Sequence, residues 1–195
     1  RYFKFKDIKL SRGTLQSLQH VGVNPLRDLK GYDVILPVPR RMDTSVGDTY
    51  IYAHVMEDFR IMNSVILERY PDYRGTMIEF FFRSNKWIAY NMFFASWKWF
   101  DQYCQWLFPI LFEVEKQVKL SGYAYQQRVF GFMSELLLPL YCFHNRYRIR
   151  YCPVLFVADD GRFANMMDLR MWLLGVRDSL KFGIMRPKRK NIRLV

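Results

Sequence analysis

The stretch that decides the fold lies at residues 125–144 and reads YQQRVFGFMSELLLPLYCFH. At about 100° per residue, its apolar side chains gather on one side of a helix: Val129, Phe132, Met133, Leu136 and Leu140. Arg128 and Glu135 lie on the sparse polar side, about 20° apart around the axis and roughly 10 Å apart along it, with Gly131 between them. The pattern predicts an amphipathic helix. Its polar side is either a solvated face, where Gly131 lets another element pack closely, or a site in which a ligand lies against the backbone.

The residues before this stretch predict a second long helix. Ser96 is a suitable N-cap, and apolar residues then recur at helical spacing through to Val118: Phe100, Tyr103, Cys104, Leu107, Phe108 and Leu111. Trp97, Trp99 and Trp106 lie off that stripe, so we expect this helix to be covered on more than one side.

Residues 87–95 (WIAYNMFFA) predict a central strand that is buried on both faces. Asn91 is its one strongly polar side chain. A buried amide needs partners, so Asn91 either bonds backbone groups or faces a cavity and binds a ligand hydroxyl.

Residues 32–36 (YDVIL) predict a short buried strand, which the sequence Pro37-Val38-Pro39 ends. The prolines predict a stiff loop that presents Arg40 and Arg41 beyond the strand. Ligands bind at such strand ends in open α/β sheets, although two solvated arginines would look the same in the sequence.

Residues 48–70 predict a helical region with a break near Glu57, where Asp58 is a candidate N-cap for the second part. His54 lies in the first part and has no metal-ligating neighbour at helical spacing, which favours a structural or hydrogen-bonding role.

The C-terminal third predicts further strands and a last helix. Residues 146–150 alternate so that Arg146, Arg148 and Arg150 would share one face of a strand. A strand over 152–158 ends at Asp159 and Asp160, which form either a connecting turn or a weak divalent-cation site. Residues 165–180 predict an amphipathic helix.

Composition bounds the class of protein. A chain of 195 residues that is 51% hydrophobic can bury one core, so we expect a single domain over residues 1–180. Lys and Arg number 30 against 18 Asp and Glu, and the net charge of +12 favours an anionic partner. The 3 cysteines show no CxxC spacing, which indicates reduced thiols in the core.

Residues 181–195 form a basic tail without an acid. Its cations suit an anionic membrane surface, and a solvated tail is the alternative. The sequence contains no apolar run of spanning length, no signal peptide, no glycine-rich phosphate loop and no HExxH or GxSxG motif.

Three segments together resemble a family of bacterial capsular and exopolysaccharide synthesis proteins, which carries a domain-of-unknown-function label and is classed with glycosyltransferases. They are YDVILP at 32–37 with the arginines after it, YNMF at 90–93 leading to FDQYCQWLF at 100–108, and YQQRVFGFMSE at 125–135. The order and spacing match over roughly residues 1–145. Members usually carry His-Tyr-Arg-Arg-Tyr-Phe, and Arg1-Tyr2-Phe3 resembles its last three residues.

The resemblance implies a GT-A-like α/β fold, with a mixed sheet flanked by helices. In the family most of the nucleotide-binding part precedes the motif that Arg1-Tyr2-Phe3 resembles. Either the natural protein starts upstream of Arg1, or sugar-nucleotide binding does not follow from the resemblance. The resemblance also implies transfer of a sugar from a nucleotide-sugar donor to a lipid-linked oligosaccharide at the cytoplasmic face of the membrane, by a protein that touches the membrane peripherally and binds no nucleic acid. Whether a divalent metal takes part stays open.

Such a transfer needs a carboxylate base and cations for the leaving diphosphate. We take Glu135 as the candidate base, because it shares a predicted helix face with Arg128 and Gly131 and lies in the family motif. The candidates for the donor phosphates are Arg128, Arg40, Arg41, Arg1 and Tyr2. The candidates for the sugar or acceptor are Asn91, His54 and Gly131.

Two other classes of function remain. One is a non-catalytic module whose cations and aromatic rings bind nucleic acid or an anionic membrane. The other is a subunit that only supports assembly of a polysaccharide-synthesis complex.

Overall fold

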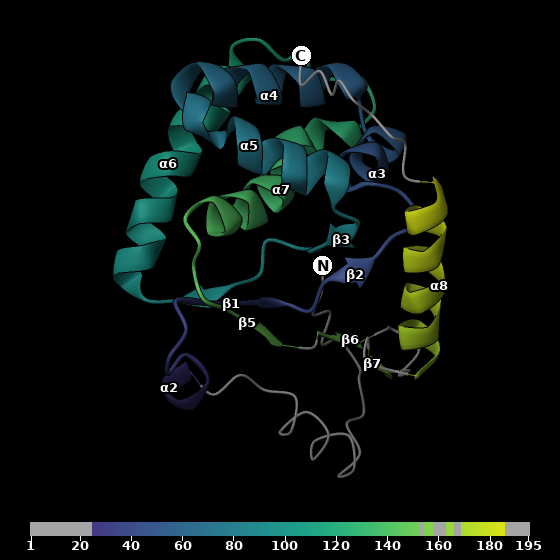
Figure 1. The fold of residues 1–195 in the computed structure, drawn as a ribbon. Coiled ribbons are helices and arrows are strands. Elements are labelled where there is room, and N and C mark those ends of the chain that lie inside the picture. The colour runs from purple at the N-terminus through teal and green to yellow at the C-terminus, as the bar shows by residue number, and fades with distance from the viewer. Residues whose placement is uncertain (1–24, 153, 158–162, 166–168, 186–195) are drawn as a thin grey trace, which may run out of the picture.

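The computed structural model describes residues 25–152, 154–157, 163–165 and 169–185 (Figure 1). Arg1, Tyr2, Asp159 and Asp160 therefore lie outside the described residues, as does the tail beyond Met185. The elements in chain order are α2 (Pro25–Asp28), β1 (Val34–Pro37), β2 (Arg40–Arg41), α3 (Val46–Ala53), α4 (Met56–Arg69), η1 (Pro71–Tyr73), α5 (Arg74–Met77), η2 (Ile78–Phe82), β3 (Lys86–Trp87), β4 (Phe94–Ala95), α6 (Trp97–Glu115), η3 (Gln126–Arg128), α7 (Val129–His144), β5 (Ile149–Cys152), β6 (Leu155–Val157), β7 (Phe163–Asn165) and α8 (Leu169–Met185).

The main sheet is mixed and has the order β4-β1-β5. β1 pairs parallel with β5, with Val34 opposite Ile149, and antiparallel with β4, with Val34 opposite Ala95. The predicted buried strand is confirmed at Val34, Ile35 and Leu36, but β1 begins two residues later than predicted and includes Pro37, which was expected to end it. Helices α3 to α7 gather on one side of β1 and β5 (Figure 1), which gives the expected mixed sheet flanked by helices.

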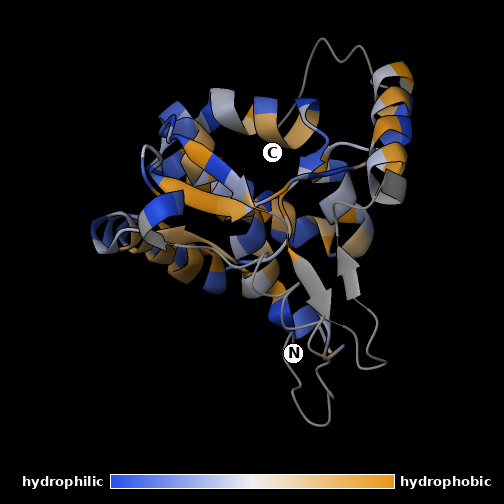
Figure 2. Ribbon diagram, turned by 90° about the horizontal axis from the view of Figure 1, so that it is seen from below, coloured by the Kyte–Doolittle hydropathy of each residue, from blue (hydrophilic) through white to orange (hydrophobic). Residues whose placement is uncertain are grey.

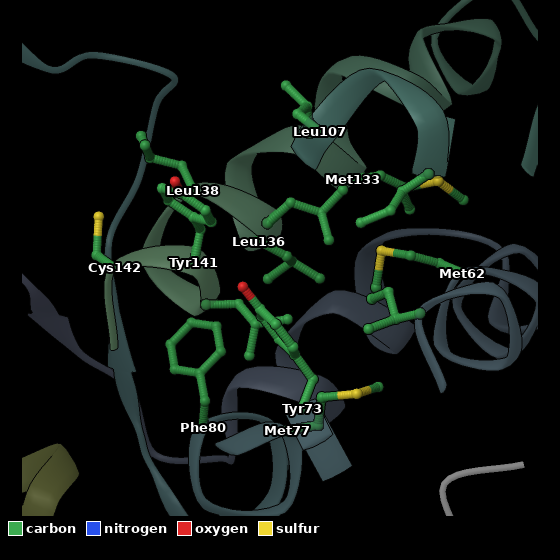
Figure 3. Packing of buried hydrophobic residues seen from close by; sticks show 14 of the residues in the cluster. Met62, Tyr73, Met77, Phe80, Leu107, Met133, Leu136, Leu138, Tyr141 and Cys142 are labelled. Atoms are coloured by element: carbon green, nitrogen blue, oxygen red, sulfur yellow. The ribbon is translucent and has the colours of Figure 1, made fainter. Parts of the chain in front are cut away.

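The hydrophobic core is built around α7. The predicted apolar stripe is confirmed, and burial extends further than the stripe because Leu137 and Leu138 are also buried. α4, α5 and α6 all pack against α7, so this helix is covered on several sides. Figure 3 shows Met133, Leu136 and Tyr141 of α7 among side chains from these neighbours. The core members drawn and labelled there also include Met62, Tyr73, Met77, Phe80, Leu107, Leu138 and Cys142.

α6 begins where the sequence predicts. Ser96 caps it by accepting a hydrogen bond from the Trp99 backbone N–H at 3.2 Å. Trp99 and Trp106 are buried, which confirms that the helix is covered beyond its apolar stripe, whereas Trp97 is 80% exposed. α6 ends at Glu115, a few residues before the predicted end at Val118.

The predicted central strand over residues 87–95 is wrong. Only the ends of this segment pair, in β3 and β4, and the residues between form turns. Tyr90 has a positive φ of 69°, a conformation that a strand cannot contain. The apolar side chains are accommodated without a strand: Ile88 is buried, and Phe93 packs on Trp99 with ring centroids 5.4 Å apart.

The break in the helical region comes earlier than predicted. α3 ends at Ala53, and the N-cap of α4 is Val55, which makes no side-chain cap. Asp58 lies inside the first turn of α4, so its predicted capping role is wrong. The capping side chain in this region is Ser45, which accepts from the Asp48 backbone N–H at 3.1 Å at the start of α3.

The arginines at 146–150 do not share one strand face. Arg146 has a φ of 53° in the turn after α7, and β5 begins only at Ile149. Arg148 pairs with Asp33 at 3.4 Å and Arg150 pairs with Asp28 at 3.0 Å, so both anchor the start of the sheet.

Other predicted boundaries also shift. Arg40 and Arg41 form the strand β2, which pairs with β3, in place of the predicted loop. The strand predicted over 152–158 is β6 at Leu155–Val157, and the last helix, α8, spans Leu169–Met185 in place of 165–180.

The cysteines are free thiols, as predicted. Only Cys142 is buried, while Cys104 and Cys152 are partly exposed, so the expected core position holds for one of them. None of the helices in the described ranges combines the length and the apolarity that a membrane span requires.

Asp33 joins the start of β1 to the turn before β5. Its carboxylate accepts the Arg148 backbone N–H at 2.7 Å, and this hydrogen bond, with the guanidinium of Arg148, lowers the pKa of Asp33. A carboxyl whose pKa is lower in the folded state stabilises the fold above its unfolded pKa, and that contribution is lost as the pH falls through the folded pKa.

We therefore predict that Asp33→Asn lowers the free energy of unfolding by about 1 kcal/mol at neutral pH. The difference from wild type should shrink below about pH 4. Urea denaturation as a function of pH measures both. The exposed carboxylate of Asp43 provides the control, since Asp43→Asn should stay within about 0.5 kcal/mol of wild type. A pH-independent loss in Asp33→Asn would contradict the assignment.

Candidate functional site

The polar side of α7 is open at Gly131. A Cβ added at Gly131 would meet no atom of the described residues within 4 Å, so the glycine is not needed to make room for a side-chain contact in that direction. The one neighbouring segment reaches the Gly131 carbonyl instead, through Asn91. The backbone of α7 is accessible at this point.

Glu135 is the central charged group of this face, where it is half-buried. Burial raises the pKa of Glu135, while a hydrogen bond from the Tyr90 backbone N–H and the charge of Arg128 lower it. Burial is the largest of these influences, so the carboxylate is more basic than one in water. The two charges interact, although Arg128 lies in η3 and the predicted α-helix from residue 125 begins only at Val129.

Asn91 lies against the same face. Its Nδ2 donates to the carbonyl oxygen of Gly131 at 3.2 Å and to the hydroxyl of Ser134 at 2.8 Å. Asn91 is exposed, since the segment around it is a turn and not a buried strand. The sequence left open whether the Asn91 amide is satisfied by the protein or faces a ligand. The amide hydrogen-bonds two groups of α7 and is also exposed at the surface.

Tyr90 brings the turn to Glu135 at an energetic cost. Its φ of 69° lies in the left-handed region, which costs roughly 1–2 kcal/mol for a residue with a Cβ. In this conformation its N–H donates to the Glu135 carboxylate. Sequence reasoning missed Tyr90, because no residue type around it signals a positive φ.

His54 lies near the first turn of α7. Its ring stacks on Phe132 with centroids 4.0 Å apart, and Tyr50 lies 4.7 Å away on the same side of α3. Gln126 Nε2 donates to the Ala53 carbonyl at 3.1 Å, which leaves its Oε1 to accept from His54 Nδ1 at 3.4 Å. Burial lowers the pKa of His54, so the ring favours its neutral form.

Phe132 connects His54 to the charged face. The guanidinium of Arg128 lies over the Phe132 ring, 5.3 Å from its centroid, on the exposed end of α7. Tyr125 packs on the same ring with centroids 5.0 Å apart and is 56% exposed. Sequence reasoning missed these two rings as part of a site, because Phe132 belongs to the apolar stripe and is read as core.

Tyr50 lies buried beneath this region. Its hydroxyl has no hydrogen-bond partner among the residues that the structure describes, and burial, with the nearby charges of Asp58 and Glu135, raises its pKa. The phenol therefore stays neutral and adds to the low-polarity surroundings that make Glu135 more basic. Its spacing of four residues from His54 was the signal that sequence analysis could have used.

Arg40 and Arg41 lie in a different place. They line a groove of ≈ 1120 Å³ between β2 and α8, and no residue of the α7 face belongs to that lining. Arg41 Nη1 donates to the Ser179 hydroxyl of α8 at 3.2 Å. The structure thus brings together Arg128, Gly131, Glu135 and Asn91, with His54 beside them, and leaves the two arginines of β2 in the groove.

Fold and site together define a mixed α/β domain with a half-buried carboxylate on an open helix face. The chain belongs to the family described as Domain of unknown function (DUF4422), which matches residues 1–146. The resemblance to a family under such a label is thereby confirmed over the expected range. No curated protein matches this chain.

A solved structure shares the fold. The apo structure of the WbbM bifunctional glycosyltransferase superposes with a TM-score of 0.58 and 22% sequence identity. The match covers 64% of this chain and 24% of that chain. At this identity the similarity shows the fold alone, and the matched part is a small share of the larger protein.

Gly and Ala variants of Tyr90 test the strained turn. Both remove the ring, but only glycine adopts a φ of 69° without a steric penalty. We expect Tyr90→Gly to be more stable than Tyr90→Ala by about 1–2 kcal/mol in urea denaturation, the reverse of the usual order of these two residues. Equal stabilities, or a more stable alanine variant, would show that the turn is not strained.

Proposed function

We propose that this chain is part of a glycosyltransferase that moves a sugar from a nucleotide-sugar donor to an oligosaccharide acceptor, with Glu135 as the general base. The observation that carries the proposal is the half-buried, more basic Glu135 carboxylate on the open face beside Gly131. The similarity of the fold to that of a bifunctional glycosyltransferase supports the proposal, and a GT-A-like fold is one of its finer parts. Surface or capsular polysaccharide and a lipid-linked acceptor are the other finer parts of the proposal.

The chemistry requires a base that is ionised yet strong. An acceptor hydroxyl attacks the anomeric carbon, its proton passes to Glu135, and the bond between that carbon and the diphosphate oxygen breaks. Burial raises the pKa of Glu135 and so makes its carboxylate a stronger base. The charge of Arg128 and the hydrogen bond from the Tyr90 N–H lower the pKa and favour the ionised form. The net effect is a raised pKa, which is what a general base that takes a hydroxyl proton requires.

The neighbouring groups have assignable roles. Asn91 directs its Nδ2 to α7, and its Oδ1 accepts no hydrogen bond from the described residues, so it is assigned to a sugar hydroxyl. Arg128 is the cation nearest to Glu135 on this face and is assigned to the leaving diphosphate. His54 and Tyr125 add ring surface beside the acceptor.

The arginines of β2 are assigned to phosphate in the separate groove and take no part in the proton transfer. Among the described residues there is no group of His, Cys, Asp and Glu that would hold a metal ion. The metal requirement is tested by measuring transfer in the natural protein before and after treatment with a strong chelator.

Glu135→Gln tests the base. We expect the rate of transfer to fall by about 10²- to 10⁴-fold, because the amide cannot take the proton. Donor binding should stay near normal, as measured by thermal shifts with a panel of uridine and guanosine diphosphate sugars. The melting temperature should not fall, because a half-buried charge is replaced by a neutral group of the same shape.

The matched control is Glu68→Gln, an exposed glutamate of α4, which should keep the full rate. Wild-type turnover in the Glu135→Gln protein would show that Glu135 is not the general base. Absence of any thermal shift with all of the sugar nucleotides, both in this chain and in a version extended upstream of Arg1, would count against the transferase itself.

Gly131→Ala separates stability from activity. The added methyl group enters open space in a helix, so the free energy of unfolding should rise by up to about 1 kcal/mol. If the acceptor lies against this backbone, the same methyl group should lower kcat/KM by roughly ten- to a hundredfold, mainly through a higher KM for the acceptor. Gly75→Ala is the control, since its added Cβ also meets nothing within 4 Å. Unchanged kinetics in Gly131→Ala would mean that the acceptor does not use this face.

A further inference from the structure

α8 exposes several of its large apolar side chains, some of which border the groove with β2. Figure 1 shows this helix at one edge of the molecule, and Figure 2 shows hydrophobic residues along its length. The exposed apolar residues are Trp172 at 62%, Leu173 at 54%, Val176 at 39%, Leu180 at 64% and Ile184 at 84%. At about 100° per residue they fall within an arc of roughly 120°. We call this set the outer face of α8.

The side of α8 that meets β2 carries small and polar residues, while Leu174 and Phe182, also outside the exposed arc, are partly buried. Ser179 accepts a hydrogen bond from Arg41 of β2 at 3.2 Å, and a Cβ at Gly175 would lie 3.7 Å from the Arg41 Cβ. Asp178 is partly buried and pairs with Arg177 at 2.7 Å. A surface helix ordinarily buries its apolar residues, so the exposed arc on α8 needs an explanation even though Leu174 and Phe182 of the same helix are partly buried. Its outer face is suited to an apolar environment outside the protein.

Cations border the outer face. Arg40 and Lys86 share the lining of one groove with Trp172 and Leu180, so positive charges lie directly beside the apolar arc. Lys181 is exposed on the same helix. The chain as a whole carries a net charge of +12, and residues 181–195 contain no acid.

We propose that α8 lies in the plane of an anionic lipid bilayer, with its outer face in the boundary between head groups and acyl chains. An apolar arc with a Trp, bordered by Lys and Arg, is the pattern of helices that bind such interfaces. The cations next to the arc would contact acidic head groups. A second copy of this chain would complement the face less well, because it would bring like charges together.

This surface is independent of the proposed transfer reaction. Neither Glu135 nor another residue of the α7 face contributes to it, and only the groove cation Arg40 is shared with the proposed phosphate site, so its failure would leave the proposed proton transfer standing. The reverse also holds, since membrane binding needs no donor or acceptor.

Co-sedimentation with lipid vesicles tests the proposal. The full chain should pellet with vesicles of phosphatidylglycerol and phosphatidylcholine in equal parts, and should stay in solution with phosphatidylcholine alone. Binding should weaken as salt is raised, because screening reduces the contribution of the cations. Trp172→Ser and Ile184→Ser should each reduce the partition coefficient by about tenfold.

The matched control is Trp97→Ser, which removes a Trp that is 80% exposed on α6 and should leave partition unchanged. Both residues of α8 are exposed, so their variants should melt at the wild-type temperature, which circular dichroism checks. The proposal is overturned if the wild-type chain ignores the acidic vesicles, or if Trp172→Ser and Ile184→Ser bind as well as wild type. It is also overturned if light scattering shows a dimer that Trp172→Ser dissociates, because a second copy would then cover the outer face.

Discussion

Burial of α7 on several sides is the constraint on which the rest of the structure depends. α4, α5 and α6 pack around it, and consecutive leucines from Leu136 to Leu138 are buried together. Each such side chain contributes about 1.5–3 kcal/mol when it leaves water. Several of them outweigh the cost of holding one carboxylate half-buried, so the fold tolerates Glu135 where it lies. The side with Arg128, Gly131 and Glu135 is the side that these helices leave open.

The site is built by a turn that ordinary secondary structure would not supply. The segment between β3 and β4 places Asn91 on the Gly131 carbonyl and directs the Tyr90 N–H at Glu135. The positive φ of Tyr90 costs free energy, and the packing of Ile88 and Phe93 on either side stabilises the turn against that cost. The carboxylate is thus tuned by three influences with different signs, from burial, a backbone donor and a neighbouring cation.

The two proposals assign different chemistry to different parts of one chain. The α7 face offers a base, a cation and an accessible backbone, which are the groups that transfer to a hydroxyl requires. α8 offers an apolar arc bordered by Arg40 and Lys86, which suits a lipid surface. A groove lined by the arginines of β2 lies between the sheet and α8, so an anionic head group and an apolar neighbour would both find complementary groups at this edge.

The sequence by itself determined the periodic and composition-dependent features: the buried strand at Val34, Ile35 and Leu36, the Ser96 cap, the apolar stripe of α7 and the interaction of Arg128 with Glu135. These follow from local propensity and from the 3.6-residue period, which neighbouring residues reveal. The strand predicted from the sequence over residues 87–95 is wrong. An apolar run indicates that its side chains are buried, but not which backbone conformation buries them. Only the tertiary structure decided that Tyr90 meets Glu135, that Gln126 holds His54 and that Arg41 packs against α8. These contacts join residues far apart in the chain, and no local pattern encodes which distant partner will satisfy a given polar group.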